Sequence, residues 1–161
     1  MTDSGQINRD RVGEDYAPPK VLPVLPGTAA AVPGPSEDLR DLVDAAGLVR
    51  RDPGLAARVL RVANASFDEA QATCSLDHAC DWLGARGTSA VLREALQQPG
   101  LSGDSWGAFQ ARCVLTALAA RCVGETVRHP DPGDLYTAGL LQGLGVLTFA
   151  ASESVPPGLD A

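Results

Sequence analysis

The feature that most constrains the fold is the spacing of apolar residues, which recur every three or four positions in segments between residues 36 and 151. This spacing is typical of amphipathic helices, and no segment shows the strict alternation of a half-buried strand. The residue types agree, because 25 Ala and 20 Leu, both strong helix formers, far outnumber 3 Phe, 2 Tyr and 2 Trp. We therefore predict an all-α domain, a compact bundle of about six helices.

Capping residues, prolines and glycines set the predicted ends of these helices. Ser36, Ser75 and the Asp52-Pro53 pair are typical of helix starts, and a glycine or Pro-Gly is typical of helix ends. The predicted helices cover residues 36–49, 53–64, 75 to Gly84 or Gly87, Thr88 or Ser89 to 96, 105–127 and 134–151.

The last of these segments, residues 134–151, is apolar on almost every side, which predicts a central and buried helix. Gly139, Gly143 and Gly145 each destabilise such a helix by up to ~1 kcal/mol relative to Ala. We expect that the close approach of a neighbouring backbone offsets this cost at these positions.

Residues 1–20 are polar, charged and without helical spacing, and we interpret them as a disordered tail. We predict one helical domain over residues 21–153, which begins with an extended segment around Pro23 and Pro26, and a short tail over residues 154–161. No segment has the ~20 apolar residues of a membrane span, and the N-terminus lacks the basic start and apolar core of a signal peptide. We therefore expect a cytoplasmic protein whose four cysteines are free thiols.

The formal net charge of −7, from 20 acidic and 13 basic residues, argues against nucleic-acid binding, because proteins that bind phosphate backbones usually carry a basic surface. The one concentrated basic feature consists of Arg50, Arg51, Arg58 and Arg61. It is either a site for an anion or an acidic partner, or a solvated helix face with cations near a helix C-terminus. We favour the solvated face and keep the four arginines as candidate interaction residues.

Residues suited to catalysis or to metal binding are few. His78 and the four cysteines lack the closely spaced cysteine pairs of structural zinc sites, and His78 and Cys80 point in different directions on a helix. His129 is interpreted as a residue that caps a helix C-terminus. No glycine-rich phosphate loop and no acidic pair within an apolar run is present in the sequence. We therefore expect no metal and no other cofactor.

Three stretches together resemble the HDOD domain, a bacterial signalling relative of the HD phosphohydrolases. The first is Leu22-Pro23-x-Leu25-Pro26 followed by residues 52–67, Asp-Pro-Gly-Leu-Ala-Ala-Arg-Val-Leu-Arg-Val-Ala-Asn-Ala-Ser-Phe. The second is residues 75–84, Ser-Leu-Asp-His-Ala-Cys-Asp-Trp-Leu-Gly, and the third is residues 134–147, which are similar to the family's Ala-Gly-Leu-Leu-His-Asp-Ile-Gly-x-Leu. The resemblance covers residues 21–151 in order and implies an all-α signalling module.

The resemblance also implies where chemistry would lie. In active HD enzymes the His-Asp pair binds a divalent metal that activates water, and the matching positions in this sequence are Gln142 and Gly143. The position of a further family histidine corresponds to Arg112, whose positive charge would repel a metal. We therefore expect no enzymatic activity. Asn64, at the end of the second predicted helix, is interpreted as a structural residue that caps the helix or bonds nearby backbone groups.

We predict a non-catalytic HDOD-type signalling module that acts by protein–protein contact, as a homodimer or with a partner protein, and without nucleic acid or membrane. The alternatives are a nucleotide-binding sensor that uses the arginines and a metal-dependent phosphohydrolase with unconventional ligands. Because the HDOD family continues through further helices, we expect an apolar strip of residues 134–151 to be exposed. Leu140, Leu144 and Leu147 are the candidate contact residues of that strip.

Overall fold

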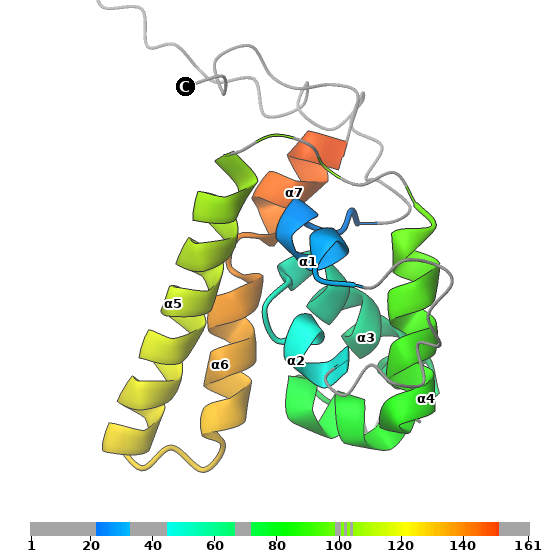
Figure 1. The fold of residues 1–161 in the computed structure, drawn as a ribbon. Coiled ribbons are helices and arrows are strands. Elements are labelled where there is room, and N and C mark those ends of the chain that lie inside the picture. The colour runs from blue at the N-terminus through cyan, green and yellow to red at the C-terminus, as the bar shows by residue number, and fades with distance from the viewer. Residues whose placement is uncertain are drawn as a thin grey trace, which may run out of the picture.

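The computed structural model describes residues 22–32, 45–66, 72–98, 101, 103 and 105–151. Within these residues all regular structure is helical, which confirms the predicted all-α class (Figure 1). The helices are α1 (Pro26–Ala30), α2 (Ala45–Val49), α3 (Pro53–Ala65), α4 (Leu76–Leu96), α5 (Ser105–Thr126), α6 (Pro132–Leu141) and α7 (Leu144–Ala151). Both predicted tails, and residues 36–44 of the first predicted helix, lie outside the described residues.

The central helix of the bundle is α3. It packs against α2, α4, α6 and α7, and eight of its 13 residues are buried. Helices α5 and α6 form an antiparallel hairpin beside it, and α7 continues from α6 (Figure 1). The core is aliphatic, as the composition predicts, with Leu55, Val59, Leu92, Leu140 and Leu147 almost fully buried.

The predicted starts of α3 and α4 are confirmed. Asp52 caps α3, since its Oδ1 accepts a hydrogen bond from the Leu55 backbone N–H at 3.0 Å, and Pro53 occupies the first turn. Ser75 caps α4 by accepting a hydrogen bond from the His78 N–H at 3.4 Å. These caps satisfy backbone donors that the start of a helix leaves without a partner.

The predicted end of the helix that starts at Ser75 is confirmed at Gly84. Two helical halves meet there within α4, and the backbone between them has a non-helical φ of 62° and ψ of 179°. A φ in this region favours glycine, which has no Cβ atom to clash with the backbone. Helical residues follow Gly84 directly, so the second half of α4 starts before the predicted Thr88 or Ser89.

The prediction of one continuous helix over residues 134–151 is also wrong. Helix α6 ends at Leu141, residues 142 and 143 form a turn, and α7 begins at Leu144. Two glycines within three residues lower the helix propensity of this stretch. The segment is not buried on every side either, because Val146 is 37% and Phe149 is 44% exposed.

The predicted close approach of a backbone holds for one of the three glycines in this segment. A Cβ atom at Gly139 would lie 2.8 Å from the Ala117 Cα and 2.9 Å from the Thr116 carbonyl oxygen, so glycine lets α6 approach the α5 backbone. At Gly143 the nearest atoms belong to side chains, and at Gly145 no atom lies within 4 Å. The prediction is therefore wrong for Gly143 and Gly145.

Candidate functional site

The turn between α6 and α7 holds the two residues that the resemblance places at the metal site of HD enzymes. Gln142 is exposed and Gly143 is buried. A Cβ atom at Gly143 would lie 2.9 Å from Phe109 Cζ and 2.9 Å from Cys113 Sγ, both on α5. Because protein interiors are close-packed, the space that a side chain would need at position 143 is already filled.

Arg112, the third position that the resemblance assigns to the metal site, also lies beside Phe109. Its guanidinium carbon is 5.7 Å from the centre of the Phe109 ring, which is a cation–π contact. The structure thus brings the three positions together around Phe109, where they contribute an amide, a glycine and a guanidinium group. None of these groups is a common ligand of a divalent metal.

Clusters of metal-ligating side chains are also missing from the described ranges. No three His, Cys, Asp or Glu side chains of those ranges lie close enough together to hold a metal ion. All four cysteines are free thiols, as predicted. Burial raises the pKa of the Cys80 and Cys113 thiols, and a hydrogen bond with Asp134 raises the pKa of Cys74. A raised thiol pKa leaves less of the nucleophilic thiolate.

His129 has the structural role at a helix end that the sequence predicts. Its backbone N–H donates to the Gly124 carbonyl oxygen at 2.8 Å, and the Arg128 N–H donates to the Glu125 carbonyl oxygen at 3.2 Å. With Arg128 at a φ of 55°, these two bonds form a Schellman motif that closes α5. The His129 ring lies against Asp131, whose N–H donates to Nδ1 at 3.2 Å.

Asn64 has the structural role that the sequence predicts. Its Nδ2 donates to the Thr73 carbonyl oxygen at 3.0 Å, and its Oδ1 accepts from the Thr73 N–H at 2.9 Å. The side-chain amide therefore joins the end of α3 to the segment that leads into α4.

Arg58, one of the four candidate interaction arginines, faces the core and not the solvent. It is 4% exposed, and its Nε donates to the Leu22 carbonyl oxygen at 2.9 Å, an oxygen that also accepts from Nη2. Burial lowers the pKa of the guanidinium group. Arg58 ties the segment before α1 to α3, so its assignment to a solvated or partner-binding face is wrong.

The other three arginines of that set have different surroundings. Arg50 pairs with Asp77 at 2.8 Å, and its carbonyl oxygen accepts a hydrogen bond from the Tyr136 hydroxyl at 2.9 Å. Arg51 is exposed in the turn between α2 and α3, and Arg61 is exposed on α3. With Arg58 turned inward, the four side chains do not converge on one site that fits a phosphate group.

Asp52 has a second role that its position as a cap does not reveal. The side chain is fully buried, and its Oδ2 accepts a hydrogen bond from the Leu25 backbone N–H at 2.8 Å. Burial raises the pKa of this carboxyl group, although hydrogen bonds from backbone N–H groups and from Thr28 oppose the shift. The Leu-Pro pattern around Leu25 predicts an extended segment. It does not predict the hydrogen bond to Asp52, because the two residues are far apart in the sequence.

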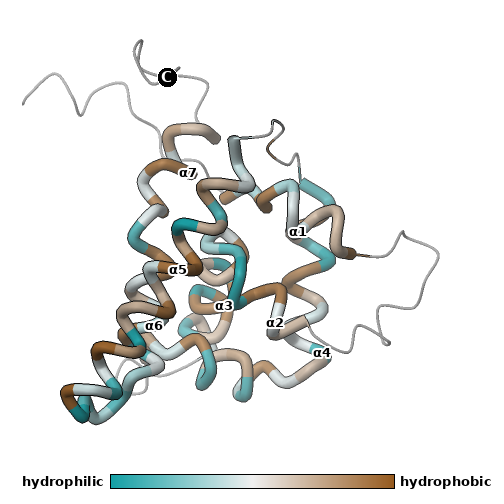
Figure 2. The backbone as a smooth tube through the Cα atoms, turned by 60° about the vertical axis from the view of Figure 1, so that its left-hand side comes forward, coloured by the Kyte–Doolittle hydropathy of each residue, from teal (hydrophilic) through white to brown (hydrophobic). Residues whose placement is uncertain are grey.

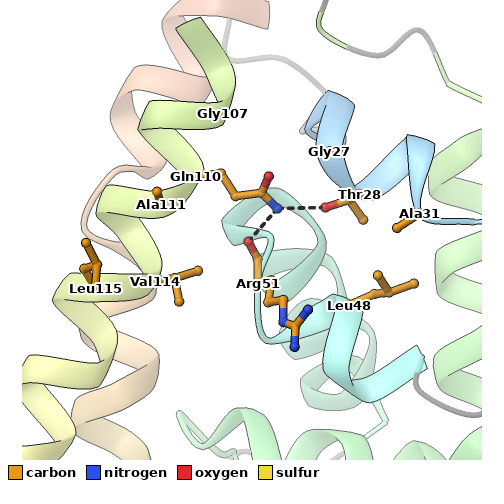
Figure 3. A pocket seen from close by; sticks show the side chains of 10 residues that line it. All are labelled: Gly27, Thr28, Ala31, Leu48, Arg51, Gly107, Gln110, Ala111, Val114 and Leu115. Atoms are coloured by element: carbon orange, nitrogen blue, oxygen red, sulfur yellow. Dashed lines mark hydrogen bonds between the residues drawn. The ribbon is translucent and has the colours of Figure 1, made fainter. Parts of the chain in front are cut away.

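An open groove of about 520 Å³ lies between α5 on one side and α1 and α2 on the other (Figure 3). Gln110 links the two sides, since its Nε2 donates to Thr28 Oγ1 at 3.2 Å and to the Arg51 carbonyl oxygen at 3.0 Å. Most of the remaining lining is small or apolar: Gly27, Ala31, Leu48, Gly107, Ala111, Val114 and Leu115. No local sequence pattern predicts this groove, because it is formed by helices from separate parts of the chain.

The leucines predicted as an exposed contact strip are mostly buried. Leu140 and Leu147 are 0% exposed, and the half-buried Leu144 packs against the core. Helix α6 is covered by α5, α3 and α4, and α7 lies against α3. The prediction of an exposed strip is therefore wrong for Leu140 and Leu147.

Helix α5 carries three of the large apolar side chains that are exposed in the described ranges: Leu115 is 66%, Leu118 is 47% and Val123 is 61% exposed, and hydrophobic segments recur along this helix in Figure 2. Helix α5 therefore has two apolar sides, of which α6 covers one. Trp82 on α4 and Val146 and Phe149 on α7 are also exposed. In the part of the chain that the structure describes, no helix combines the length and the apolar composition of a membrane span.

These observations define the class of protein: an all-α bundle around α3, in which the positions that the resemblance assigns to the HD metal site carry Arg112, Gln142 and Gly143. The family model of the HDOD domain matches residues 22–155. The chain therefore belongs to the HDOD domain family, which confirms the resemblance.

Two solved structures of the MmoQ response regulator from Methylococcus capsulatus str. Bath are similar to this chain. One matches with a TM-score of 0.63 and 24% sequence identity, and the other, a fragment, with a TM-score of 0.62 and 26% identity. Each match covers 81% of this chain but 54% and 52% of the MmoQ chains, so this chain spans about half their length. No curated protein matches the chain.

Proposed function

We propose that this chain is a non-catalytic HDOD module of a bacterial signalling system, located in the cytoplasm, and that it acts through protein–protein contact. Membership of the HDOD family and the similarity to a response regulator support a signalling-associated role. The observation that carries the non-catalytic part of the proposal is the packing around Gly143.

A metal-dependent phosphohydrolase needs protein ligands for its metal and an open coordination position for water or phosphate. At Gly143, even the first side-chain atom of a ligand would lie only 2.9 Å from Phe109 and from Cys113. Arg112, stacked on the same ring, adds a positive charge that repels a divalent cation. The missing carboxylate, the filled space and the nearby cation all disfavour metal binding.

Exposed apolar surface supports the part of the proposal that concerns protein contact. The groove beside α5 and the outward side of α5 itself adjoin each other at Ala111 and Leu115, which line the groove and are exposed. Contiguous apolar surface of this kind often marks an interaction site on a protein. The arginines give less support to a nucleotide sensor, because Arg58 is engaged in the core.

Elemental analysis and a hydrolysis assay test the non-catalytic proposal. We expect the purified chain to contain no stoichiometric divalent metal, and to hydrolyse neither phosphodiesters nor phosphomonoesters with manganese, magnesium or iron present. The Gln142→Ala variant is the matched control, because its exposed side chain can be removed without disturbing the core. One tightly bound transition metal per chain, or metal-dependent hydrolysis that Gln142→Ala reduces, would contradict the proposal.

A further inference from the structure

The outward side of α5 has a regular pattern that the core does not use. The residues buried from this helix, Phe109, Cys113, Ala117 and Gly124, lie on its opposite side. Five exposed residues, spaced alternately by three and four, form what we call the α5 row: Ala108, Ala111, Leu115, Leu118 and Cys122. Within the described ranges α5 packs mainly against α6 and also touches α1, and neither helix covers the row.

The spacing of the α5 row is the pattern with which two helices pack in a coiled coil. Over the two heptads of the row, the difference between 3.5 and 3.6 residues per turn rotates it by only about 40°, so a straight helix keeps all five residues on one side. The row is uncharged, whereas the solvent side of a surface helix usually carries polar and charged residues. Its shape and chemistry therefore fit a second helix.

We propose that the α5 row binds the α5 row of a second copy of this chain, with the two helices antiparallel about a twofold axis. With the axis between Leu115 and Leu118, Leu115 packs against the partner's Leu118, and Ala111 packs against the partner's Cys122. The bulky pairs then occupy the centre of the contact, and each smaller pair, an alanine with a cysteine, flanks it. The row is thus complementary to itself, as a twofold contact requires.

The charges along α5 select the antiparallel arrangement. The row continues at Glu125, which in a parallel pair would face the partner's Glu125, and like charges in contact are unfavourable. In the antiparallel pair Glu125 faces the partner's Ala108 and keeps its ion pair with Arg121, at 2.9 Å. Arg112 and Arg121 lie on opposite flanks of the row. In the antiparallel pair each therefore faces uncharged residues of the partner, and no like charges meet.

This inference goes beyond the proposed function, because a catalytic protein could form the same dimer. Failure of the dimer would leave the metal and hydrolysis tests unaffected, and a bound metal would leave the dimer test unaffected.

Disulfide crosslinking of the full chain tests the contact and its register. In a Cys74→Ser background, Cys122 is the remaining exposed cysteine, and Ala111→Cys adds a thiol that the antiparallel pair places against the partner's Cys122 at a distance suited to a disulfide. Under mild oxidation at micromolar concentration, we expect this variant to give severalfold more disulfide-linked dimer than the background chain. Adding Leu118→Glu should reduce that yield severalfold.

Two controls define the results that would overturn the proposal. The Cys74→Ser chain alone reports on the parallel arrangement, in which Cys122 would face the partner's Cys122. Thr116→Cys places an exposed thiol on the same helix but beside the row. Equal crosslinking of the Ala111→Cys and Thr116→Cys variants would overturn the dimer, and strong crosslinking of the Cys74→Ser chain would overturn the antiparallel register. Because positions 74, 111 and 116 are exposed, these substitutions leave the core intact.

Discussion

The start of α3 and the turn between α6 and α7 both lie in stretches where this chain resembles the HDOD domain, yet their residues do different things. At the start of α3, Asp52 and Arg58 bond the segment before α1, and Gly54 lets the two backbones approach. At the turn, Gln142 points to solvent and Gly143 packs against α5 side chains. The family pattern at α3 therefore builds the fold, which forms although the turn carries an amide and a glycine where the resemblance places a His-Asp pair.

Gly54 gives the largest expected effect on this comparison. A Cβ atom there would collide with the Pro23 carbonyl oxygen, and neither backbone can move without separating the segment before α1 from α3. We expect Gly54→Ala to lower the free energy of unfolding by about 3 kcal/mol, measured by urea denaturation. Gly107→Ala, with no atom within 4 Å of the new Cβ, is the control and should be neutral or slightly stabilising. A loss as small as the control's would show that the two backbones are not held together.

Asp52→Asn is expected to have the next largest effect. The amide keeps the size of the side chain but has one oxygen, so it cannot accept from both the Leu25 and the Leu55 N–H groups. One buried donor then loses its acceptor, and we expect a loss of about 2 kcal/mol in urea denaturation. Asp81→Asn, an exposed carboxylate on α4, is the matched control and should change little.

The pH dependence of the Asp52→Asn effect has a defined sign. Because burial raises the pKa of Asp52 above its ordinary value of 3.8, the folded state holds this proton more readily than the unfolded state. The stabilisation that follows is present in full below pH 3.8 and is lost as the pH rises through the folded pKa. The stability difference between the wild-type chain and Asp52→Asn should therefore shrink as the pH rises through that window. A difference that grows with pH would contradict a raised pKa for this carboxyl group.

The sequence predicts those parts of the fold that depend on near neighbours. Caps and apolar spacing act within one or two helical turns. The starts of α3 and α4, at Asp52 and Ser75, and the buried faces of α3 and α5 could therefore be predicted. Helix α4 also breaks at the predicted Gly84, whereas the break after α6 was not predicted, because the apolar pattern of residues 134–151 runs on through the glycines. The inward turn of Arg58 depends on the carbonyl oxygen of Leu22, which is distant in the sequence.

The candidate site divides in the same way. The resemblance located positions 112, 142 and 143, but the filling of their space by Phe109 is a contact between distant helices. The exposed apolar surface was assigned to residues 134–151 because that segment is the most apolar. In the structure α5, α3 and α4 cover α6, and only Val146 and Phe149 of α7 stay exposed among the large apolar side chains of that segment, while one side of α5 is left uncovered. Position in the bundle, which periodicity does not report, decides which apolar side remains exposed.

The smallest effects are expected at Gly143, in the turn between α6 and α7, and at Gly145, near the start of α7, and their signs differ. Gly145→Ala adds a Cβ atom with no neighbour within 4 Å, so we expect a gain of about 0.5 kcal/mol from the reduced freedom of the unfolded chain. Gly143→Ala pushes against the side chains of Phe109 and Cys113, and a loss of about 1 kcal/mol is expected. Thermal denaturation of both variants measures the difference. If Gly143→Ala were as stabilising as Gly145→Ala, a side chain would fit at position 143, and the main support for a non-catalytic function would be lost.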